Sequence, residues 1–230
     1  MRSVVLPPRL AALLEMIQSP KKVADIGCDH GKLSAAMALM GIPVVAVDIS
    51  EPSLRKTMEL KNQLGLDNIE TRLGDGLVPI HKDEVDLVIM AGVGQQTIID
   101  ILKRDWDKVQ GAQLLLQSMD GAYKLRRYLS AQNVRFVDES LSKDNNRIYC
   151  AMLVQWGNGP ELSEIECILG PVLLKKQPDL FHKFLQEQIS KLYGIIAGLN
   201  KANSPQDAEP ADYERTLKSL MEVRDGHHST

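Results

Sequence analysis

Short apolar runs alternate with helical patterns between Val23 and Gln132, and this alternation limits the possible folds more than any other feature of the chain. We predict strands at 23–26, 43–47, 68–73, 85–91 and 113–117, and helices at 33–40, 52–64, 96–104 and 123–132. Strand–helix units at this spacing form right-handed crossovers. The run at 43–47 is continuously apolar, which suits a strand with both faces covered. We therefore expect an α/β fold with a doubly wound, mainly parallel sheet.

Different patterns flank this region. Apolar residues at positions 10, 13, 14 and 17 predict an amphipathic helix near the N-terminus. Val134–Ser140 and Arg147–Trp156 predict two strands of an antiparallel hairpin, joined by the loop LSKDNN. The sequence WGNGP then breaks the pattern. We therefore assign a first domain to residues 1–157 and a second domain to residues 158–230.

The second domain has a purely helical pattern after Pro171. One apolar stripe at three-four spacing starts at Phe181 and continues to Leu199, and another starts at Tyr213. The segment ANSPQDAEP between the stripes is rich in turn-forming residues. Two amphipathic helices joined in this way predict an antiparallel, coiled-coil-like hairpin.

Composition narrows the class of protein. Hydrophobic residues make up 44 % of the chain and charged residues 25 %, as in a globular protein with a sizeable core. We see no apolar run of about 18 residues and no apolar signal segment, so we expect no membrane anchor. The three cysteines are far apart and lack metal-ligand spacing, which favours reduced thiols in the cytoplasm and no metal site. We expect a monomer.

The charge distribution is close to neutral, with a formal net charge of −3. Many nucleic-acid-binding domains have a basic excess, and this chain has none. An RNA partner would therefore need a local basic patch. The run Lys124–Arg127 is the densest basic cluster. We interpret it as a solvated helix face, with RNA contact as the alternative.

The loop after the first strand, Asp25-Ile26-Gly27-Cys28-Asp29-His30-Gly31, carries the strongest functional signal. Gly27 permits a tight turn and close approach of a ligand to the backbone, and the next helix presents free N–H groups. Dinucleotide sites use Gly-x-Gly-x-x-Gly and bind pyrophosphate there. A carboxylate at Asp29 would repel pyrophosphate and favour a cationic amine or sulfonium. The loop therefore predicts S-adenosylmethionine as cofactor, with contacts from Asp25, Gly27, Cys28 and Asp29.

Site-type residues also follow the next three strands, and the carboxyl ends of parallel strands are where such sheets bind ligands. Asp48 ends the second strand, where an acid accepts hydrogen bonds from both ribose hydroxyls. After the third strand, an acid lies between two glycines, and its carboxylate suits the adenine amine. A glycine-rich segment leads out of the fourth strand. The predicted cofactor contacts from these segments are Asp48, Ile49, Gly74, Asp75, Gly76, Ala91, Gly92, Val93 and Gly94.

With these residues assembled, the chain resembles the bacterial tRNA adenine-N1 methyltransferases that modify adenine 22 in the D-loop. The resemblance covers most of the chain and includes RLAALLEMI, VADIGCDHGKL, RLGDGL, DLVIMAGVG and LGPVLLKKQPDLFHKFL. It implies a Rossmann-like class I methyltransferase fold with an N-terminal helix and a C-terminal helical hairpin. It also implies S-adenosylmethionine as cofactor, tRNA as substrate, and a role for the C-terminal helices in docking tRNA.

The chain departs from the family pattern in three segments. The loop after the fourth strand is usually Gly-Met-Gly-Gly, and here Val93 and Gln95 replace two of its residues. The fifth strand is usually followed by Gln-Pro-Asn, and here Gln117 is followed by Ser118-Met119. Ser34 replaces the proline expected after Asp-His. These positions face the acceptor, so the sequence supports the cofactor half of the site better than the tRNA half.

The predicted reaction is methyl transfer to N1 of adenine, whose lone pair needs no prior deprotonation. Alignment and desolvation would then be the main contributions of the enzyme. The product base is cationic, so a carboxylate could stabilise the developing charge. We assign this role to Asp29 and assign His30 to orienting Asp29 or the base. The alternatives are a small-molecule or protein acceptor, a cofactor-binding module without catalysis and, less favoured, a nicotinamide-dependent dehydrogenase.

Overall fold

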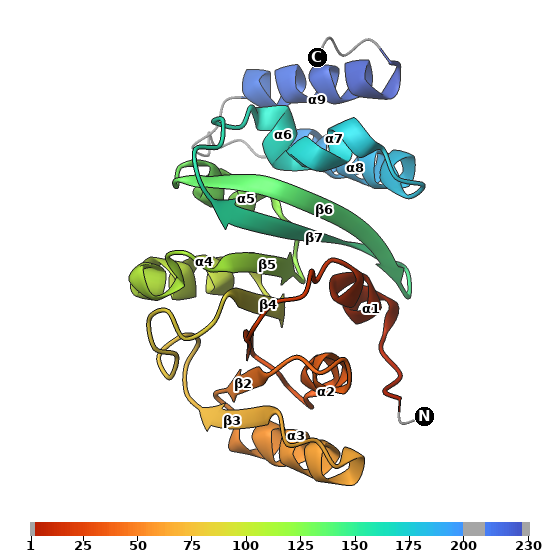
Figure 1. Cartoon of the computed structure of the whole chain (residues 1–230). Coiled ribbons are helices and arrows are strands. Elements are labelled where there is room, and N and C mark those ends of the chain that lie inside the picture. The colour runs from red at the N-terminus through yellow and green to blue at the C-terminus, as the bar shows by residue number, and fades with distance from the viewer. Residues whose placement is uncertain (1–2, 200–209, 227–230) are drawn as a thin grey trace. The chain divides into compact units, whose positions relative to one another are not determined.

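The computed structural model describes residues 3–199 and 210–226 (Figure 1). The chain divides into two units, Met1–Glu161 and Leu162–Thr230. The boundary that the sequence suggests after Gly157, and the roles assigned to the two domains, stay predictions.

The first unit is built on one seven-stranded sheet in the order β3-β2-β1-β4-β5-β7-β6. The strands are β1 (Val23–Ile26), β2 (Val44–Asp48), β3 (Ile69–Leu73), β4 (Leu87–Val93), β5 (Gln113–Ser118), β6 (Val134–Asp144) and β7 (Arg147–Trp156). The first five run parallel, while β7 is antiparallel to both β5 and β6. The predicted Rossmann-like fold class is therefore confirmed.

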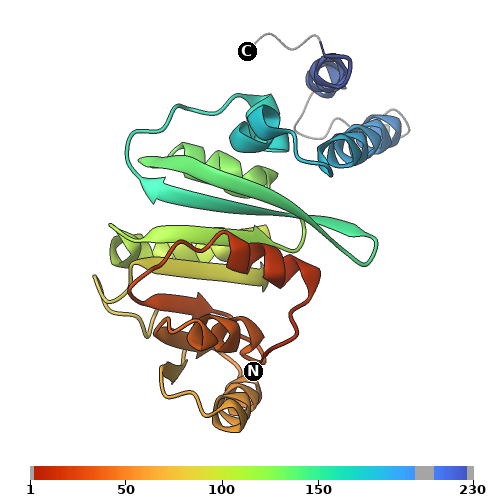
Figure 2. The same cartoon turned by 45° about the vertical axis from the view of Figure 1, so that its right-hand side comes forward.

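Helices cover both faces of the sheet (Figures 1 and 2). The first group is α1 (Pro8–Glu15), α2 (Lys32–Leu39) and α3 (Glu51–Leu64), and the second is α4 (Gln95–Asp105), the 3-10 turn η1 (Trp106–Val109) and α5 (Tyr123–Ser130). Leu13 of α1, Met37 of α2 and Leu54 of α3 pack with Ala46 and Ile89 of the sheet in one buried cluster. This core fixes the carboxyl ends of the central strands at one edge of the sheet.

The hairpin at the end of the sheet differs from the sequence-based expectation. Residues 141–144 continue β6, and Leu141 pairs with Cys150. Asn145 and Asn146 alone connect the strands, and Asn145 has a left-handed φ of 53°. The predicted six-residue loop was therefore wrong. The polar residues Ser142, Lys143 and Asp144 hid this part of the strand, because it lacks a buried face and so lacks apolar alternation.

The second unit is helical, with α6 (Glu164–Leu169), α7 (Pro171–Lys176), α8 (Phe181–Leu199) and α9 (Pro210–Arg224). The two predicted helical segments correspond to α8 and α9, which pack against each other. Their predicted linker lies outside the described residues apart from Pro210. The sequence reading missed α6, although Ser163 and Glu166 form a capping box at its start, a signal that the sequence contains.

Candidate active site

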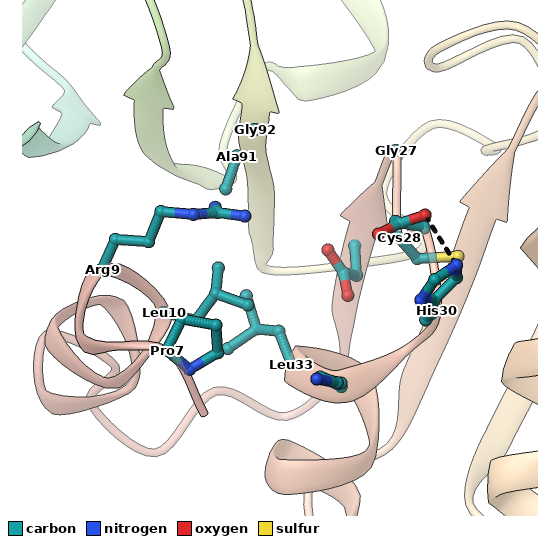
Figure 3. Close-up of a pocket in the computed structure, with 12 residues that line it drawn as sticks. Pro7, Arg9, Leu10, Gly27, Cys28, His30, Leu33, Ala91 and Gly92 are labelled. Carbon is teal, nitrogen blue, oxygen red and sulfur yellow. Dashed lines mark ion pairs between the residues drawn. The ribbon is translucent and has the colours of Figure 1, made fainter. Parts of the chain in front are cut away.

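Two cavities lie at the carboxyl edge of the sheet and meet at the loop after β1. The larger, of about 360 Å³, extends from this loop towards the ends of β2 and β3 and the face of α4. The smaller, of about 230 Å³, lies between the loop and the N-terminal turn of α1 (Figure 3). Gly27, Asp29 and Gly92 line both cavities. A ligand lying across these three residues could therefore occupy both cavities at once.

The loop is held by backbone hydrogen bonds and by glycine conformations. Gly27 and Cys28 donate their amides to the carbonyl of Val47 at 2.8 and 3.0 Å, which ties the loop to β2. Gly31 begins α2 with a φ of +66°, and a Cβ at this position would lie 2.4 Å from Cγ2 of Thr57. Only glycine satisfies both the conformation and the contact. The loop is therefore pinned at both of its ends.

Asp29, between these pinned ends, has a φ of 50°. A non-glycine residue in the left-handed region is uncommon, and such residues are frequent at functional sites. Its backbone N–H donates to Oδ2 of Asp48 at 2.9 Å, while its own carboxylate is 74 % exposed. The conformation thus presents the Asp29 carboxylate to the junction of the two cavities.

Asp48 connects β2 to this loop. Its Oδ2 accepts from Asp29 and its Oδ1 accepts from the backbone N–H of Ser50 at 2.8 Å. Each carboxylate oxygen has two lone pairs, so both can accept a further hydrogen bond. Asp48 and Ile49 line the larger cavity, where they can contact a ribose and an adenine ring, respectively. The structure thus places both residues where the sequence reading expects a nucleoside.

Asp25 lines the smaller cavity and is only 3 % exposed. The Ser34 hydroxyl donates to its Oδ2 at 2.5 Å. Burial raises the pKa of Asp25 to about 6, and the hydrogen bonds from Ser34 oppose this rise. Burial also raises the pKa of the neighbouring Cys28 thiol well above its usual value, so this cysteine is a neutral thiol rather than a nucleophile.

His30 lies at the rim of the smaller cavity (Figure 3). Its Nε2 lies 2.8 Å from Nζ of Lys56 and 3.5 Å from Oδ1 of Asp29. A charged lysine ammonium only donates hydrogen bonds, so Nε2 of His30 must accept the bond from Lys56. In this contact Nε2 is therefore the acceptor, and the ring N–H is on Nδ1.

Asp75 lies at the far end of the larger cavity but is held from outside it. Arg104 of α4 donates to its Oδ2 at 2.6 Å and to its backbone carbonyl at 2.8 Å. Lys108 donates to the carbonyls of Leu77 and Val78 at 3.0 and 2.9 Å. Arg104 thus positions Asp75 within the loop Gly74–Gly76, and Lys108 holds the two residues that follow this loop. Sequence reasoning missed both basic side chains, because their spacing along the chain does not indicate a partner about 30 residues away.

The segment Ala91–Gly94 is not the loop that the sequence suggested. β4 continues through Val93, and its pairing with β5 shifts register between Ala91 and Val93. Ala91 lines the smaller cavity, Val93 the larger, and Gly92 both. Gly94 is instead the N-cap of α4 and is not part of either lining. The exit loop was a wrong prediction, because the β-bulge keeps these small residues within the strand.

Two of the departures from the family pattern, in the segments after β4 and β5, meet in space at the start of α4, whereas Ser34 lies on α2. Asp120 accepts from the backbone N–H of Gln95 at 2.7 Å, and the Gln95 side chain accepts from the backbone N–H of Lys124 at 2.9 Å. Asp120, which follows β5, therefore caps the start of α4, and Gln95, which follows β4, caps the start of α5. The two altered loops form one rigid connection next to the cavities.

Arg9 is a cavity residue that the sequence analysis did not single out. It comes from the first turn of α1 and lines the smaller cavity (Figure 3). Its Nη1 donates to Oε1 of Gln117 at 3.4 Å, and it lies above Gly92, where a Cβ would be 3.7 Å from the same nitrogen. A cation beside Gly92 can bind a carboxylate or a phosphate. The sequence signal that could have identified Arg9 was its position just after Pro7-Pro8, at the start of a helix.

The cluster Lys124–Arg127 is not a uniformly solvated face. Arg126 is fully buried, and its Nε donates to Oε1 of Glu139 at 2.7 Å. Its Nη2 also lies 2.8 Å from the Cys150 sulfur. Arg126 therefore joins α5 to the hairpin β6–β7 and cannot contact RNA.

Two absences hold for the described residues only. Between residues 3 and 199 and between 210 and 226, no helix is long and apolar enough to cross a membrane. The same stretches contain no group of three or more His, Cys, Asp or Glu residues that could hold a metal ion.

Comparisons with known proteins agree with this geometry. Residues 6–152 match the family model described as a methyltransferase domain. The tRNA (adenine(22)-N(1))-methyltransferase of Bacillus subtilis is 27 % identical over 98 % of this chain and 95 % of its own. The crystal structure of the B. subtilis m1A22 tRNA methyltransferase TrmK superposes with a TM-score of 0.82, 25 % identity, and coverage of 98 % of this chain and 99 % of that one.

A second solved structure, M. capricolum TrmK in complex with S-adenosylhomocysteine, has a TM-score of 0.80 and 25 % identity. It covers 97 % of this chain and 99 % of its own. The resemblance seen in the sequence is thereby confirmed. The chain belongs to the methyltransferase-domain family and, within it, to the family of the bacterial tRNA (adenine(22)-N1)-methyltransferases.

Proposed function

We propose that this protein is an S-adenosylmethionine-dependent methyltransferase that methylates N1 of adenine 22 in tRNA. The observation that carries the proposal is the pair of cavities joined at Gly27, Asp29 and Gly92. One cavity has the carboxylate acceptors and apolar walls for a nucleoside, and the other has charged groups for an amino acid. The bridge between them is where a sulfonium would lie.

The residues present fit this cofactor. In the larger cavity, Asp48 would accept from the ribose, and Ile49 and Ile101 would enclose the adenine. Asp75, held by Arg104, would accept from the adenine amine through its remaining oxygen. In the smaller cavity, Asp25 would face the cationic ammonium group and Arg9 the carboxylate. We assign Gly27, Cys28, Gly74, Gly76, Ala91, Gly92 and Val93 to backbone or shape contacts.

The bound cofactor supplies an electrophilic methyl group. The chain holds the donor and the adenine in line and excludes water from them, which can contribute several kcal/mol to the rate. Asp29 is at the junction and is exposed, so its carboxylate can stabilise the positive charge that develops on the base. Because Nε2 of His30 accepts from Lys56, His30 would act through its Nδ1–H, as a donor that orients Asp29 or the base.

The test is incubation of the purified protein with labelled cofactor and unmodified tRNA, with adenine 22 intact or replaced by guanine. We expect the labelled methyl group to be incorporated only into the tRNA with adenine 22 intact. Mass analysis of the nucleosides of that tRNA should then show 1-methyladenine. Asp29→Asn should lower kcat by roughly tenfold to a hundredfold, on the scale of a lost charge-stabilising group, with cofactor affinity little changed. Asp83→Asn is a matched control, because Asp83 is also exposed and also has a left-handed φ, of 59°.

Two outcomes would contradict the proposal. Cofactor binding without transfer to any tRNA would support a binding module that has lost catalysis. Transfer to tRNA lacking adenine 22 would indicate another acceptor. A cytoplasmic location and a monomeric state stay predictions, and light scattering of the purified protein would test the second.

A further inference from the structure

Asp25 is a buried carboxyl group that faces the smaller cavity. It is 3 % exposed, and Ser34, which is fully buried, donates its hydroxyl to Oδ2 at 2.5 Å. Its register partners in the sheet are apolar, with Ala46 on β2 and Ile89 on β4. The carboxyl is therefore held in one orientation, with apolar strands on either side and the cavity in front.

Several charged or titratable groups lie around this cavity, on each element that forms it. They are Arg9 on α1, Cys28, Asp29 and His30 on the loop, Lys32 on α2 and, from β2, Asp48. Asp48 disfavours ionisation of Asp25 and Ser34 favours it, while burial is the dominant cause and raises the pKa of Asp25 to about 6. Without a ligand, Asp25 is therefore protonated in part of the molecules near neutral pH.

We propose that Ser34 positions the Asp25 carboxyl toward the amino-acid end of the cofactor, so that binding of that end releases to solvent the proton from those molecules in which Asp25 is protonated. The inference rests on the proposed function, because it needs a cofactor with an ammonium group. A cation placed against Asp25 favours its ionised form. By linkage, the same cation must then bind more weakly at a pH where Asp25 holds its proton.

The expected size follows from this linkage. S-adenosylhomocysteine has the ammonium group, whereas methylthioadenosine shares its adenosine and thioether but lacks the amino acid. We expect the affinity of the full-length protein for S-adenosylhomocysteine to be about tenfold weaker at pH 5 than at pH 7.5. Affinity for methylthioadenosine should stay constant over this range. Calorimetry at pH 6 in phosphate and in imidazole buffer should detect about half a proton released per site, because a group with a pKa of about 6 is then half protonated.

Substitutions assign the proton to a residue. Asp25→Asn should abolish the proton release and the pH dependence. Ser34→Ala removes a bond that favours the ionised form, so the fall in affinity should begin about half a pH unit to one unit higher. Ser140→Ala is the matched control, because it removes a hydroxyl that bonds the sulfur of Met16, and neither residue lines either cavity. His30→Asn should keep the proton release, although histidines titrate in the same pH range.

The measurements separate two kinds of failure. If S-adenosylhomocysteine binds with the same affinity from pH 5 to 7.5 and releases no proton, the inference is wrong and the proposed function stands. An unchanged midpoint in Ser34→Ala would remove Ser34 from the mechanism. If methylthioadenosine weakens in parallel with S-adenosylhomocysteine, the titrating group does not face the amino acid. Absence of binding at every pH would overturn the proposed function together with the inference. Calorimetry of the wild-type protein distinguishes these outcomes even if a variant fails to fold.

Discussion

Four aspartates in the candidate site show how the surroundings of one side chain type determine its role. Asp25 is buried against a single hydroxyl, and Asp48 accepts from two backbone amides. Asp75 is held by an arginine, and Asp29 is exposed in a left-handed conformation. The burial of Asp25 affects the stability of the protein as well as cofactor binding.

Asp25→Asn should stabilise the protein in the absence of cofactor. A pKa raised from 3.8 to about 6 means that ionising Asp25 in the folded state costs on the order of 3 kcal/mol. The folded state holds a proton that the unfolded state loses, so the cost is complete above pH 6 and absent below about pH 4. Urea unfolding at pH 7.5 should therefore show a gain of about 1–3 kcal/mol that disappears at pH 4.

The control for this prediction is Asp29→Asn, which removes the same charge at an exposed position and should change the unfolding free energy by less than about 0.5 kcal/mol. A gain from Asp25→Asn that persisted at pH 4 would contradict the assignment to ionisation. A stabilising substitution that weakens cofactor binding is a common trade-off at functional sites.

At the scale of elements, the contact between α2 and α3 depends on the absence of a side chain at Gly31. We expect Gly31→Ala to destabilise the protein by about 2–4 kcal/mol, through the left-handed φ and through overlap with Thr57. Gly41→Ala is a matched control with a φ of +86° and nothing within 4 Å of the added Cβ, so it should cost only about 1 kcal/mol. Chemical denaturation would measure both. Equal costs would show that the contact is unimportant.

The buried ion pair between α5 and β6 gives another prediction at this scale. Arg126→Met would leave Glu139 buried without its cation partner and should cost about 3–5 kcal/mol. Arg126→Met with Glu139→Leu removes both charges and should recover most of that loss. Thermal or urea unfolding of the three proteins forms the comparison. A double variant as unstable as Arg126→Met would mean that packing, not the unpaired charge, dominates.

The elements that could be predicted from sequence are those with two buried faces or one strong apolar stripe. β1 and β7 have the predicted bounds, and the other strands and long helices of the first unit begin or end within a few residues of them. β6 was too short in the prediction because its last four residues are mostly polar, and α6 was missed because it is only six residues long. Local periodicity cannot detect either feature.

The residues of the candidate site also divide into those that could be predicted from sequence and those that could not. Acids and glycines at strand ends could be predicted because parallel strands bring those ends to one edge. Arg9, Ser34 and Arg104 could not be assigned, because their partners are set by how helices pack on the sheet. Arg126 misled the reading for the same reason, since a helix face is buried or exposed only in its tertiary context.

At the scale of the whole molecule, electrostatics limits how tRNA can bind. The net charge is −3, and residues 158–230 have 8 basic against 11 acidic side chains. General attraction to a polyanion is therefore weak, so binding must depend on a few local phosphate contacts. Lys183 and Lys191 lie on α8, are exposed, and line one shallow groove. They are our candidates for such contacts in the C-terminal unit.

The double variant Lys183→Glu/Lys191→Glu should raise KM for tRNA on the order of tenfold at about 0.15 M salt and leave cofactor affinity unchanged. Each phosphate contact that is lost should lower the slope of log affinity against log salt by about 1, so two should lower it by about 2. Lys21→Glu/Lys82→Glu makes the same charge change at exposed positions near the amino ends of β1 and β4, away from both cavities, and should leave the slope unaltered. If both double variants changed KM and slope equally, tRNA would respond to total charge alone, and α8 would have no particular part in docking.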